Sequence, residues 1–262
     1  MMALRTAATG MAAQDLNVDV ISNNIANLNT VGYKKQRAEF EDLLYQDIQR
    51  AGAQSSDTGT IVPTGIQIGA GVRTGAVYRI TTQGSPTITG NQYDLAINGK
   101  GFFQVLLPSG ETAYTRAGNF APNANGQLVT TDGYLVQPQI TIPQGTTAVT
   151  ISATGQVQAT IPGATAPTIV GQLTLATFLN EGGLEATGNN LFMQTAASGA
   201  PTLGDPASTG IGSLIQGDIE SSNVDPVTEI TALIVAQRAY EMNSKVVTSA
   251  DQMLSTTNAM KQ

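Results

Sequence analysis

The sequence of 262 residues contains no cysteine, no histidine and no tryptophan. Without cysteine there is no disulfide framework and no thiol chemistry. Without histidine or cysteine, a zinc or copper site lacks its usual ligands. A Ser-His-Asp or Cys-His nucleophile is excluded for the same reason. The enzyme chemistry that remains rests on paired carboxylates, Ser-Lys pairs, tyrosine or oxygen-ligated metals, and the sequence predicts no cofactor.

Charge is also scarce. Charged residues make up 12% of the chain, against about 25% in an average soluble protein. The net charge of −7 makes a nucleic-acid or other phosphate-binding role improbable, because such proteins carry basic surfaces. Broad surfaces with few charges associate easily, so the composition favours a protein that packs against other proteins.

Long hydrophobic runs are absent too. No stretch holds 18 consecutive apolar residues, so the sequence predicts no membrane-spanning helix. The first residues, "MMALRTAATGMAAQDLNVDV", have no continuous apolar segment and soon reach Asp15 and Asp19. We therefore expect no cleaved Sec signal, which fits either a cytosolic protein or one exported by another route.

Both ends of the chain carry heptad repeats. In residues 3–28, Leu4, Met11, Val18 and Ile25 are seven apart, and Ala7, Gln14, Ile21 and Leu28 follow each by three. Near the other end the same spacing joins Leu233, Tyr240, Val247 and Leu254, with Ile230, Ala236, Ala250 and Met253 completing the pattern. This is the a/d pattern of coiled-coil-like helices. Asp225 and Pro226 supply an N-cap and a first helical residue for the second helix.

The middle of the chain has a different pattern. Residues 60–215 are rich in Gly, Pro and Thr, and short alternating runs such as "QLVTTDGYLV" and "QLTLATF" are separated by turn sequences. This spacing predicts antiparallel β structure. The predicted fold is α+β: terminal helices at 1–32 and 226–262 pair as a coiled-coil-like domain, an extended β connector covers 33–78 and 208–225, and an antiparallel β domain is inserted at 79–207.

The helices are apolar on more than one face. "ITALIVAQRAYEM" in the second helix has apolar residues all round, and residues 1–33 contain only Arg5, Asp15 and Asp19 as charged groups. A helix of this kind is normally buried on several sides. We therefore expect the helices to pack against further copies of themselves, whereas an ordinary monomeric helical hairpin is the alternative.

The first helix is followed by "NNIANLNTVGYKK", residues 23–35. Asparagine tolerates the left-handed conformation and glycine adopts it freely, so we expect Asn24, Asn27, Asn29 and Gly32 to end the helix. Beyond this turn, we expect the basic side chains of Lys34, Lys35 and Arg37 to face the acids Glu39, Glu41 and Asp42.

The acids of the middle region are the one possible catalytic set. They are Asp94, Glu111, Asp132, Glu181 and Glu185. Most of them stand in turn sequences, where carboxylates are usually solvated, and there is no histidine to assist them. The sequence therefore predicts a protein that is not an enzyme.

Four segments resemble the bacterial flagellar rod and hook family. They are "ISNNIANLNTVGYKKQRAEFEDLLYQ" near the N-terminus, "YDLAINGKGFFQV" and "YTRAGNFAPNANGQLVTTDGYLVQP" in the middle, and "GDIESSNVDPVTEITALIVAQRAYEMNSKVVTSADQML" near the C-terminus. Together they cover well over half the chain in the family's order. The family motif residues are Asn24, Asn27, Asn29, Gly32, Tyr33, Gln237, Arg238 and Tyr240.

The connector gives a finer resemblance. Residues 51–77, "AGAQSSDTGTIVPTGIQIGAGVRTGAV", are similar to the segment that is typical of distal rod subunits. Its apolar residues Ile61, Ile66, Ile68 and Val72, with Pro63 at a bend, suit a β arm that docks on an adjacent subunit. A proximal rod or hook-type subunit of the same family, or an unrelated fibre-forming cell-surface or phage tail protein, remains an alternative.

The resemblance implies a role and a location. It implies a homopolymer that forms the straight, hollow drive shaft of the flagellar basal body, encloses the export channel and passes torque to the hook. The helical seam residues that would pack between subunits are Leu4, Met11, Val18, Ile21, Ile25, Leu28, Ile230, Leu233, Tyr240, Val247 and Leu254. The implied partners are proximal rod proteins, the hook protein, the P- and L-ring bushing proteins and the flagellar type III export apparatus. The implied location runs from the periplasm to the outer membrane.

Overall fold

The computed structural model describes residues 2–49, 64–163 and 166–260. The chain divides into two compact units. The first, called the helical unit here, contains residues 1–25, 36–78 and 225–262; the second, the β unit, contains residues 26–35 and 79–224. With an N-terminal helix, a C-terminal helix and an antiparallel β-rich region between them, the fold is α+β as predicted.

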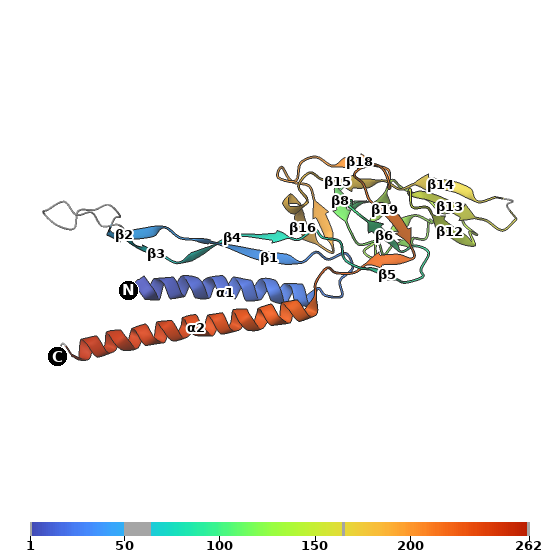
Figure 1. Cartoon of the computed structure of the whole chain (residues 1–262). Helices are drawn as coiled ribbons and strands as arrows, with labels where there is room; N and C mark the ends of the chain where they lie inside the picture. Colours follow the sequence, from blue (N-terminus) through green and yellow to red (C-terminus); the bar gives the residue numbers. More distant parts are fainter. Residues whose placement is uncertain (1, 50–63, 164–165, 261–262) are drawn as a thin grey trace. The chain divides into compact units, whose positions relative to one another are not determined.

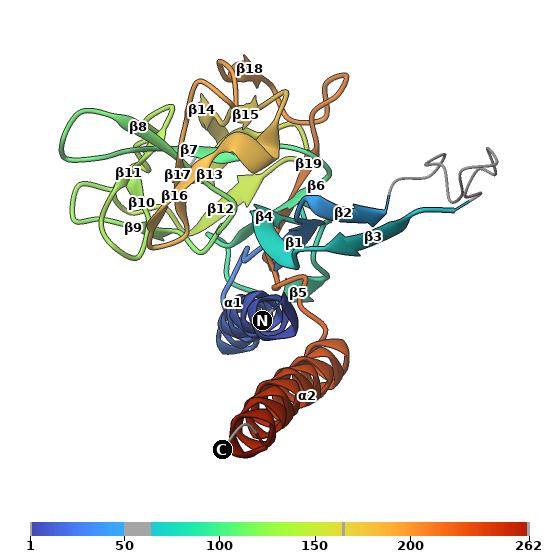
Figure 2. The ribbon, with the colours of Figure 1, turned by 90° about the vertical axis from the view of Figure 1, so that its left-hand side faces the viewer.

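Two long helices and two pairs of strands form the helical unit. Helix α1 (Met2–Ala26) and helix α2 (Pro226–Ala259) run antiparallel, as Figures 1 and 2 show. Strand β1 (Gln36–Asp42) pairs with β4 (Val72–Arg79), and β2 (Tyr45–Gln49) pairs antiparallel with β3 (Ile66–Gly69). In Figure 1, α1 lies between this ribbon of strands and α2.

Helix α2 begins with the cap that the sequence predicts. The backbone N–H of Val227 donates to the Asp225 carboxylate at 3.3 Å, and the Thr228 hydroxyl donates to the same carboxylate. The backbone N–H of Glu229 donates to the Asp225 carbonyl at 3.0 Å, which closes the first turn. Asp225 therefore satisfies donors that a helix leaves open at its N-terminus, and Pro226 follows without losing a hydrogen bond.

The end of α1 differs in part from the expectation. The asparagines do not adopt the left-handed conformation: in the described part of the chain, the only non-glycine residues with positive φ are Asn189, Asn190 and Ala207. Asn24 instead lies inside α1, and the helix ends at Ala26. The left-handed residue is Gly32, with φ of 69°. Gly32 is therefore left-handed as expected, whereas Asn24 belongs to the helix, and Asn27 and Asn29 follow its last residue without adopting that conformation.

The β unit is built from short antiparallel strands in several sheets. The largest sheet has the order β16-β17-β8-β7-β11-β10-β9, and smaller sheets pair β12-β13-β14, β15-β18, β19-β6 and β20-β5. The elements are β5 (Pro86–Ile88), β6 (Leu95–Asn98), β7 (Phe103–Leu106), β8 (Thr112–Thr115), β9 (Ala121–Pro122), β10 (Leu128–Val129), β11 (Leu135–Gln137), β12 (Ala148–Ile151), β13 (Gln156–Thr160), β14 (Thr168–Gln172), β15 (Leu175–Thr177), the 3-10 helix η1 (Glu181–Gly183), β16 (Glu185–Gly188), β17 (Leu191–Met193), β18 (Thr202–Gly204), β19 (Ser213–Gln216) and β20 (Asp218–Glu220).

The β unit has its own apolar core. Its centre is formed by fully buried side chains from β6, β7, β13 and β15, including Leu95, Ile97, Phe103 and Val157. A second cluster gathers aromatic rings, with Tyr114 and Phe178 edge to face at a centroid distance of 4.8 Å. Alternation of buried and exposed residues along β12 and β13 is what a sheet with one covered face requires.

Candidate functional site

The inner face of α2 in the helical unit is lined by small and polar residues. Glu229, Ala236, Asn243 and Ala250 stand seven apart, and of these Glu229, Ala236 and Ala250 are buried and Asn243 is half-buried. Asn243 meets α1 at Gly10, where an added Cβ would lie 2.9 Å from the Asn243 Nδ2. The two helices therefore approach through small side chains rather than through large apolar ones.

The predicted seam residues fall into two groups. In α1 and the turn after it, Leu4, Met11, Val18, Ile25 and Leu28 are half-buried and Ile21 is buried. In α2, Leu233 and Val247 are half-buried, whereas Ile230, Tyr240 and Leu254 are exposed. The line 233–240–247–254 thus lies at the flank of the inner face of α2, where it can meet other molecules.

Many large apolar side chains of α2 are exposed. They are Val227, Ile230, Ile234, Val235, Tyr240, Met242, Val246, Met253 and Leu254. Soluble monomers rarely expose contiguous apolar surface of this kind, and such surface usually marks an interface. None of the helices in the described part of the chain is long and apolar enough to span a membrane.

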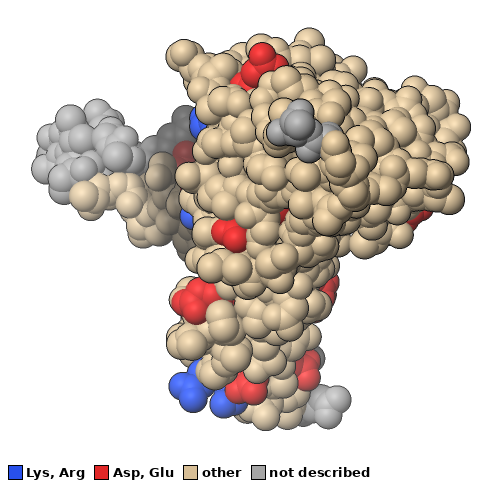
Figure 3. Space-filling view, turned by 90° about the vertical axis from the view of Figure 1, so that its right-hand side faces the viewer, with Lys and Arg blue, Asp and Glu red and all other residues tan. Residues whose placement is uncertain are grey.

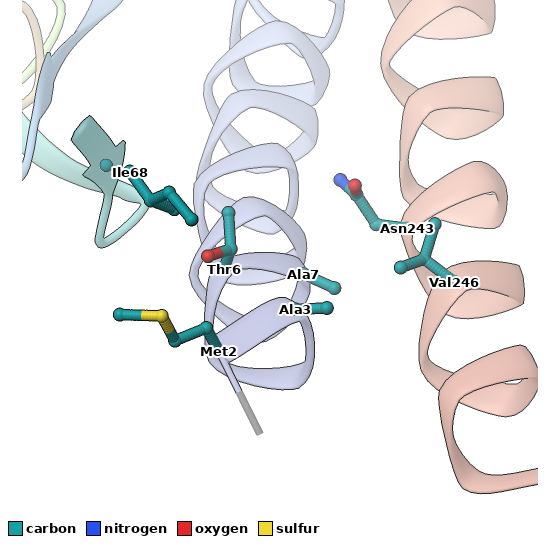
Figure 4. A pocket seen from close by; sticks show the side chains of 8 residues that line it. Met2, Ala3, Thr6, Ala7, Ile68, Asn243 and Val246 are labelled. Carbon is teal, nitrogen blue, oxygen red and sulfur yellow. The ribbon is translucent and has the colours of Figure 1, made fainter. Parts of the chain in front are cut away.

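Two grooves open on the helical unit. The first, of about 520 Å³, is lined by Met2, Ala3, Thr6 and Ala7 of α1, Ile68 and Gly69 of β3, and Asn243 and Val246 of α2 (Figure 4). The second, of about 590 Å³, lies between Gln14 and Asn17 of α1 and a stretch of α2 from Val227 to Ala239. Small and apolar side chains dominate both grooves, and neither contains a charged residue.

Asn24 links three segments of the helical unit. Its side chain accepts a hydrogen bond from the Gln36 backbone N–H at 2.8 Å and donates to the Gln36 carbonyl at 2.8 Å. It also donates to the Glu229 carboxylate at 3.1 Å. Both Asn24 and Glu229 are buried. One side chain therefore joins the end of α1, the start of β1 and the first turn of α2, which explains why this position requires an amide.

A buried cluster of charges sits where the chain enters and leaves the β unit. The Glu220 carboxylate accepts hydrogen bonds from Lys34 Nζ at 2.6 Å, from Arg116 Nε at 2.5 Å and from the Gly84 backbone N–H at 2.8 Å. The exposed fractions are 1% for Glu220, 6% for Lys34 and 5% for Arg116. The Arg116 guanidinium also donates to the carbonyls of Ile97, Gly99 and Gly101.

The electrostatics of this cluster are set by burial and by its own charges. Burial alone raises the pKa of Glu220, but the neighbouring Arg116 charge and the hydrogen bonds from Lys34 and Arg116 outweigh it, so the pKa lies below its usual value. Burial lowers the pKa of Lys34, and the opposing pull of Glu220 does not fully offset it. No local sequence pattern indicates the cluster, because Lys34 and Glu220 are 186 residues apart.

The expectation for the residues after Gly32 was therefore only partly right. Lys34 pairs with Glu220 and also donates to the Thr82 carbonyl at 2.9 Å, so it does not face the acids of β1. Arg37 does pair with Glu39, at 2.9 Å on the surface. Glu41 is paired at 2.6 Å with Arg73, from the neighbouring strand β4. Burial of Lys34 next to a carboxylate is what separates it from the nearby acids.

Gly32 and Tyr33 complete this corner of the β unit. The Gly32 backbone N–H donates to the Glu220 carbonyl at 2.8 Å, and the Tyr33 carbonyl accepts from the Asn223 N–H at 3.4 Å. A Cβ on Gly32 would lie 2.9 Å from backbone atoms of Arg116 and Ala117. Glycine is therefore required both for the positive φ and for the close approach of the chain. Among the other motif residues, Asn27 accepts a hydrogen bond from Thr30, Asn29 is exposed, and Gln237 and Arg238 are exposed on α2.

The predicted connector arm is partly described. Ile61 and Pro63 lie outside the described residues. Ile66 and Ile68 in β3 are exposed, and Val72 at the start of β4 is half-buried, with its N–H donating to the Thr9 hydroxyl at 3.3 Å. Tyr45 and Ile48 of β2 and the preceding Leu44 are also exposed, so both β2 and β3 carry exposed apolar side chains in the part of the chain that the structure describes.

The acids considered for catalysis lie mostly on the surface. Asp94 is buried and accepts hydrogen bonds from Thr89 at 2.6 Å and Asn91 at 3.0 Å, so it stabilises a turn. Glu111, Asp132 and Glu185 are exposed and Glu181 is half-buried in η1. In the residues that the structure describes, no group of three or more His, Cys, Asp and Glu residues could hold a metal ion. One face of the molecule, in Figure 3, shows scattered charges on a largely uncharged surface.

Comparison with known proteins gives matches along the whole chain. Residues 4–34 match the model described as "Flagella basal body rod protein", residues 96–159 match "Flagellar hook protein FlgE/F/G D1 domain", and residues 215–260 match "Flagellar basal body rod FlgEFG protein C-terminal". The chain is 67% identical to the flagellar basal-body rod protein FlgG of Caulobacter vibrioides over 100% of both chains. It is 55% identical to FlgG of Agrobacterium fabrum over 97% of both and 40% identical to FlgG of Bacillus subtilis over 96% of both. With the rod protein FlgF of Caulobacter vibrioides the identity falls to 38%, over 88% of this chain and 85% of that protein.

Proposed function

The chain belongs to the FlgG family of flagellar basal-body rod proteins, and from this premise we propose how its surfaces build the rod. It is a structural subunit of the distal rod of the bacterial flagellar basal body. We propose that copies of the chain polymerise helically into a straight, hollow shaft that transmits torque from the motor to the hook. In this proposal α1 and α2 pair in a coiled-coil-like manner and pack against the same helices of neighbouring copies.

The observation that carries this proposal is the exposed apolar surface of α2. Val235, Met242 and Met253 are each more than 60% exposed. Burying one such side chain contributes about 1.5–3 kcal/mol, so a row of them repeated along a polymer supplies a strong driving force. In a monomeric helical hairpin these side chains would face the partner helix, whereas here that face carries Glu229, Ala236 and Asn243.

A second feature suits a tube that passes other proteins. The helices combine few charges with many Asn, Gln, Ser and Thr side chains. A lining of this kind binds an unfolded chain weakly, because it offers neither strong ion pairs nor a continuous apolar strip. We infer that the helical unit surrounds the export channel and that the β unit forms the outer layer. The chain itself has no catalytic role in this proposal.

The proposed partners follow from the position of a distal rod. They are proximal rod proteins at one end, the hook protein at the other, and the P- and L-ring bushing proteins around the shaft. We propose that the flagellar type III apparatus exports the subunit without a cleaved Sec signal and that the rod runs through the periplasm to the outer membrane.

The polymer proposal is tested in a strain that lacks the chromosomal gene. Reintroducing the wild-type chain should restore swimming and should restore the distal rod in electron micrographs of purified basal bodies. Basal bodies with complete distal rods in the uncomplemented deletion strain would contradict the role, since no other protein should replace the subunit. The same strain serves for the variants described below.

We further propose that the connector stiffens the rod. A tube bends when neighbouring subunits slide past each other, so stiffness requires a further tie between them. The exposed residues Ile66 and Ile68 give the β2–β3 hairpin an apolar surface that can dock on an adjacent subunit. Deleting residues 51–68 should therefore leave export and polymerisation intact but give rods that bend in electron micrographs. Straight rods of ordinary appearance would place the stiffness in the helices instead.

A further inference from the structure

The outer face of α1 carries a regular stripe of small residues. Arg5, Ala8, Ala12, Asp15, Asp19 and Ser22 are all exposed, and their spacing alternates between three and four residues. In a helix with 3.6 residues per turn this spacing gives a single face. Apart from Arg5 the side chains are short, so another helix can approach closely. We call this face the small-residue stripe.

The exposed apolar residues of α2 include a straight row. Val235, Met242, Val246 and Met253 are separated by seven, four and seven residues, and they are exposed by 62%, 61%, 47% and 64%. These separations return each side chain to nearly the same angle around the helix. Val235 also lines the groove next to Gln14 and Asn17, and Val246 lines the groove next to Ala3 and Ala7. We call this row the large apolar stripe.

The charges beside the two stripes are complementary. Asp15 and Asp19 in the small-residue stripe are one helical turn apart, where like charges repel each other. Arg238 and Lys245 flank the large apolar stripe on one side and stand seven residues apart, with the exposed Glu241 between them. In the described residues none of these four side chains forms an ion pair. The two acids are about 6 Å apart along one helix, and the two basic residues are about 10 Å apart along the other. Because Arg and Lys side chains are long and flexible, each can still reach one of the acids.

We propose that the small-residue stripe of α1 is the docking surface for the large apolar stripe of α2 from a second copy of this chain. Asp19 then lies beside Arg238 and Asp15 beside Lys245, because copies that point the same way along a polymer present α2 antiparallel to α1. The inference rests on the proposed function, since it names the two surfaces that meet in the homopolymer.

This pairing also accounts for an open polymer. The two stripes are different surfaces, so each copy offers one stripe to the next copy on one side and the other stripe on the other side. A heterologous contact of this type produces rings or helical filaments rather than closed dimers. Contact between two small-residue stripes would instead bring Asp15 and Asp19 of both copies together and leave the large apolar stripe exposed.

A charge exchange in the deletion strain tests the proposal. Asp15→Lys with Asp19→Lys, and separately Arg238→Glu with Lys245→Glu, should each lower the number of basal bodies with a distal rod by about tenfold or more. The chain with all four substitutions should return to within about twofold of wild type. As a control of equal net charge, Asp15→Lys and Asp19→Lys are combined with Arg37→Glu and Lys100→Glu, which belong to neither stripe, and this chain should not recover.

Cross-linking gives a readout that does not depend on motility. The natural chain has no cysteine, so one copy carrying Ala12→Cys and a differently tagged copy carrying Val246→Cys can be produced together and treated with a short bis-maleimide. Cross-linked dimers that contain both tags are expected, whereas Thr248→Cys in place of Val246→Cys, on the other side of α2, should give none.

The outcomes separate this inference from the proposed function. The docking of the two stripes is supported if the variant with all four substitutions recovers and the pair Ala12→Cys and Val246→Cys gives dimers. Equal recovery of the control variant would overturn the docking proposal, and so would a wild-type number of rods in the variants with two substitutions. Either result would leave the polymer proposal intact. Failure of the wild-type chain to restore rods would count against the proposed function itself.

Discussion

Glu220→Gln should strongly lower the free energy of unfolding of the β unit. It keeps the shape of the side chain but removes the charge that Lys34 at 2.6 Å and Arg116 at 2.5 Å share. Two buried cations then lose their counter-charge, and an amide NH₂ group is brought against N–H donors. Breaking a buried ion pair by removing one partner costs about 3–5 kcal/mol. This is a large part of the free energy of unfolding of a typical domain, which is about 5–15 kcal/mol.

The measurement is urea unfolding of the full chain at pH 7, followed by far-ultraviolet circular dichroism. With a slope of about 2–3 kcal/mol per molar urea, the unfolding midpoint of the β unit should fall by about 1–2.5 M. The matched control is Glu39→Gln, which removes a carboxylate paired with Arg37 on the surface, where both side chains are more than half exposed. That pair should contribute less than about 1 kcal/mol, so its midpoint should stay close to wild type.

The pH dependence supplies an independent check. The pKa of Glu220 is lower in the folded protein than in the unfolded chain. The contribution of Glu220 to folding stability is therefore fully present above the pKa of the unfolded chain, about 4.3, and is lost as the pH falls through the lower pKa of the folded protein. Wild type should therefore lose stability below about pH 4 in part through this group, and Glu220→Gln should lack that part. A Glu220→Gln midpoint within error of wild type at pH 7 would refute the reasoning.

Three further predictions concern other positions. Gly32→Ala should destabilise the β unit by more than about 2 kcal/mol in the same urea titration, because it combines a left-handed backbone with a clash against Arg116 and Ala117. The control is Gly110→Ala, which also has a positive φ but lies in open space. It should cost only about 1 kcal/mol. Asn24→Ala should lower the stability of the helical unit by about 1–3 kcal/mol, measured by thermal circular dichroism, since buried partners lose hydrogen bonds; an unchanged melting curve would contradict the linking role. Leu233→Asp or Val247→Asp should abolish rod assembly, because an unpaired carboxylate buried between subunits costs several kcal/mol, while the β unit should remain resistant to protease; normal swimming of both variants would argue against packing at these positions.

The sequence predicted those features that depend on local pattern. The heptads located both helices, and the start of α2 at Pro226 followed from Asp225 and the proline. The antiparallel β region followed from alternation and turn residues. Each of these signals extends over a few to a few tens of residues, so one sequence is enough to read it.

Features that depend on distant contacts could not be predicted. The Lys34–Glu220 pair joins segments near opposite ends of the chain, and nothing near Lys34 distinguishes a buried lysine from a solvated one. Similarly, Asn24 was expected to end a helix, because asparagine commonly adopts turn conformations. Only its position next to Gln36 and Glu229 shows that it serves as a hydrogen-bonding link.

The face of α2 that meets α1 explains the architecture of the helical unit. A heptad pattern read from large residues favours Leu233, Tyr240, Val247 and Leu254 as the seam, but the side chains that meet α1 include Ala236 and Asn243. Small residues inside and large apolar residues outside are the reverse of what stabilises an isolated helical hairpin. In the homopolymer proposed above, identical copies would bury the outer apolar side chains. The β unit, in contrast, has a core of large buried residues and a buried charge cluster whose ion pairs join residues of this unit, so we expect it to fold without assembly. Under this proposal one unit is complete alone and the other is completed by its neighbours, a division that suits a subunit added singly to a growing shaft.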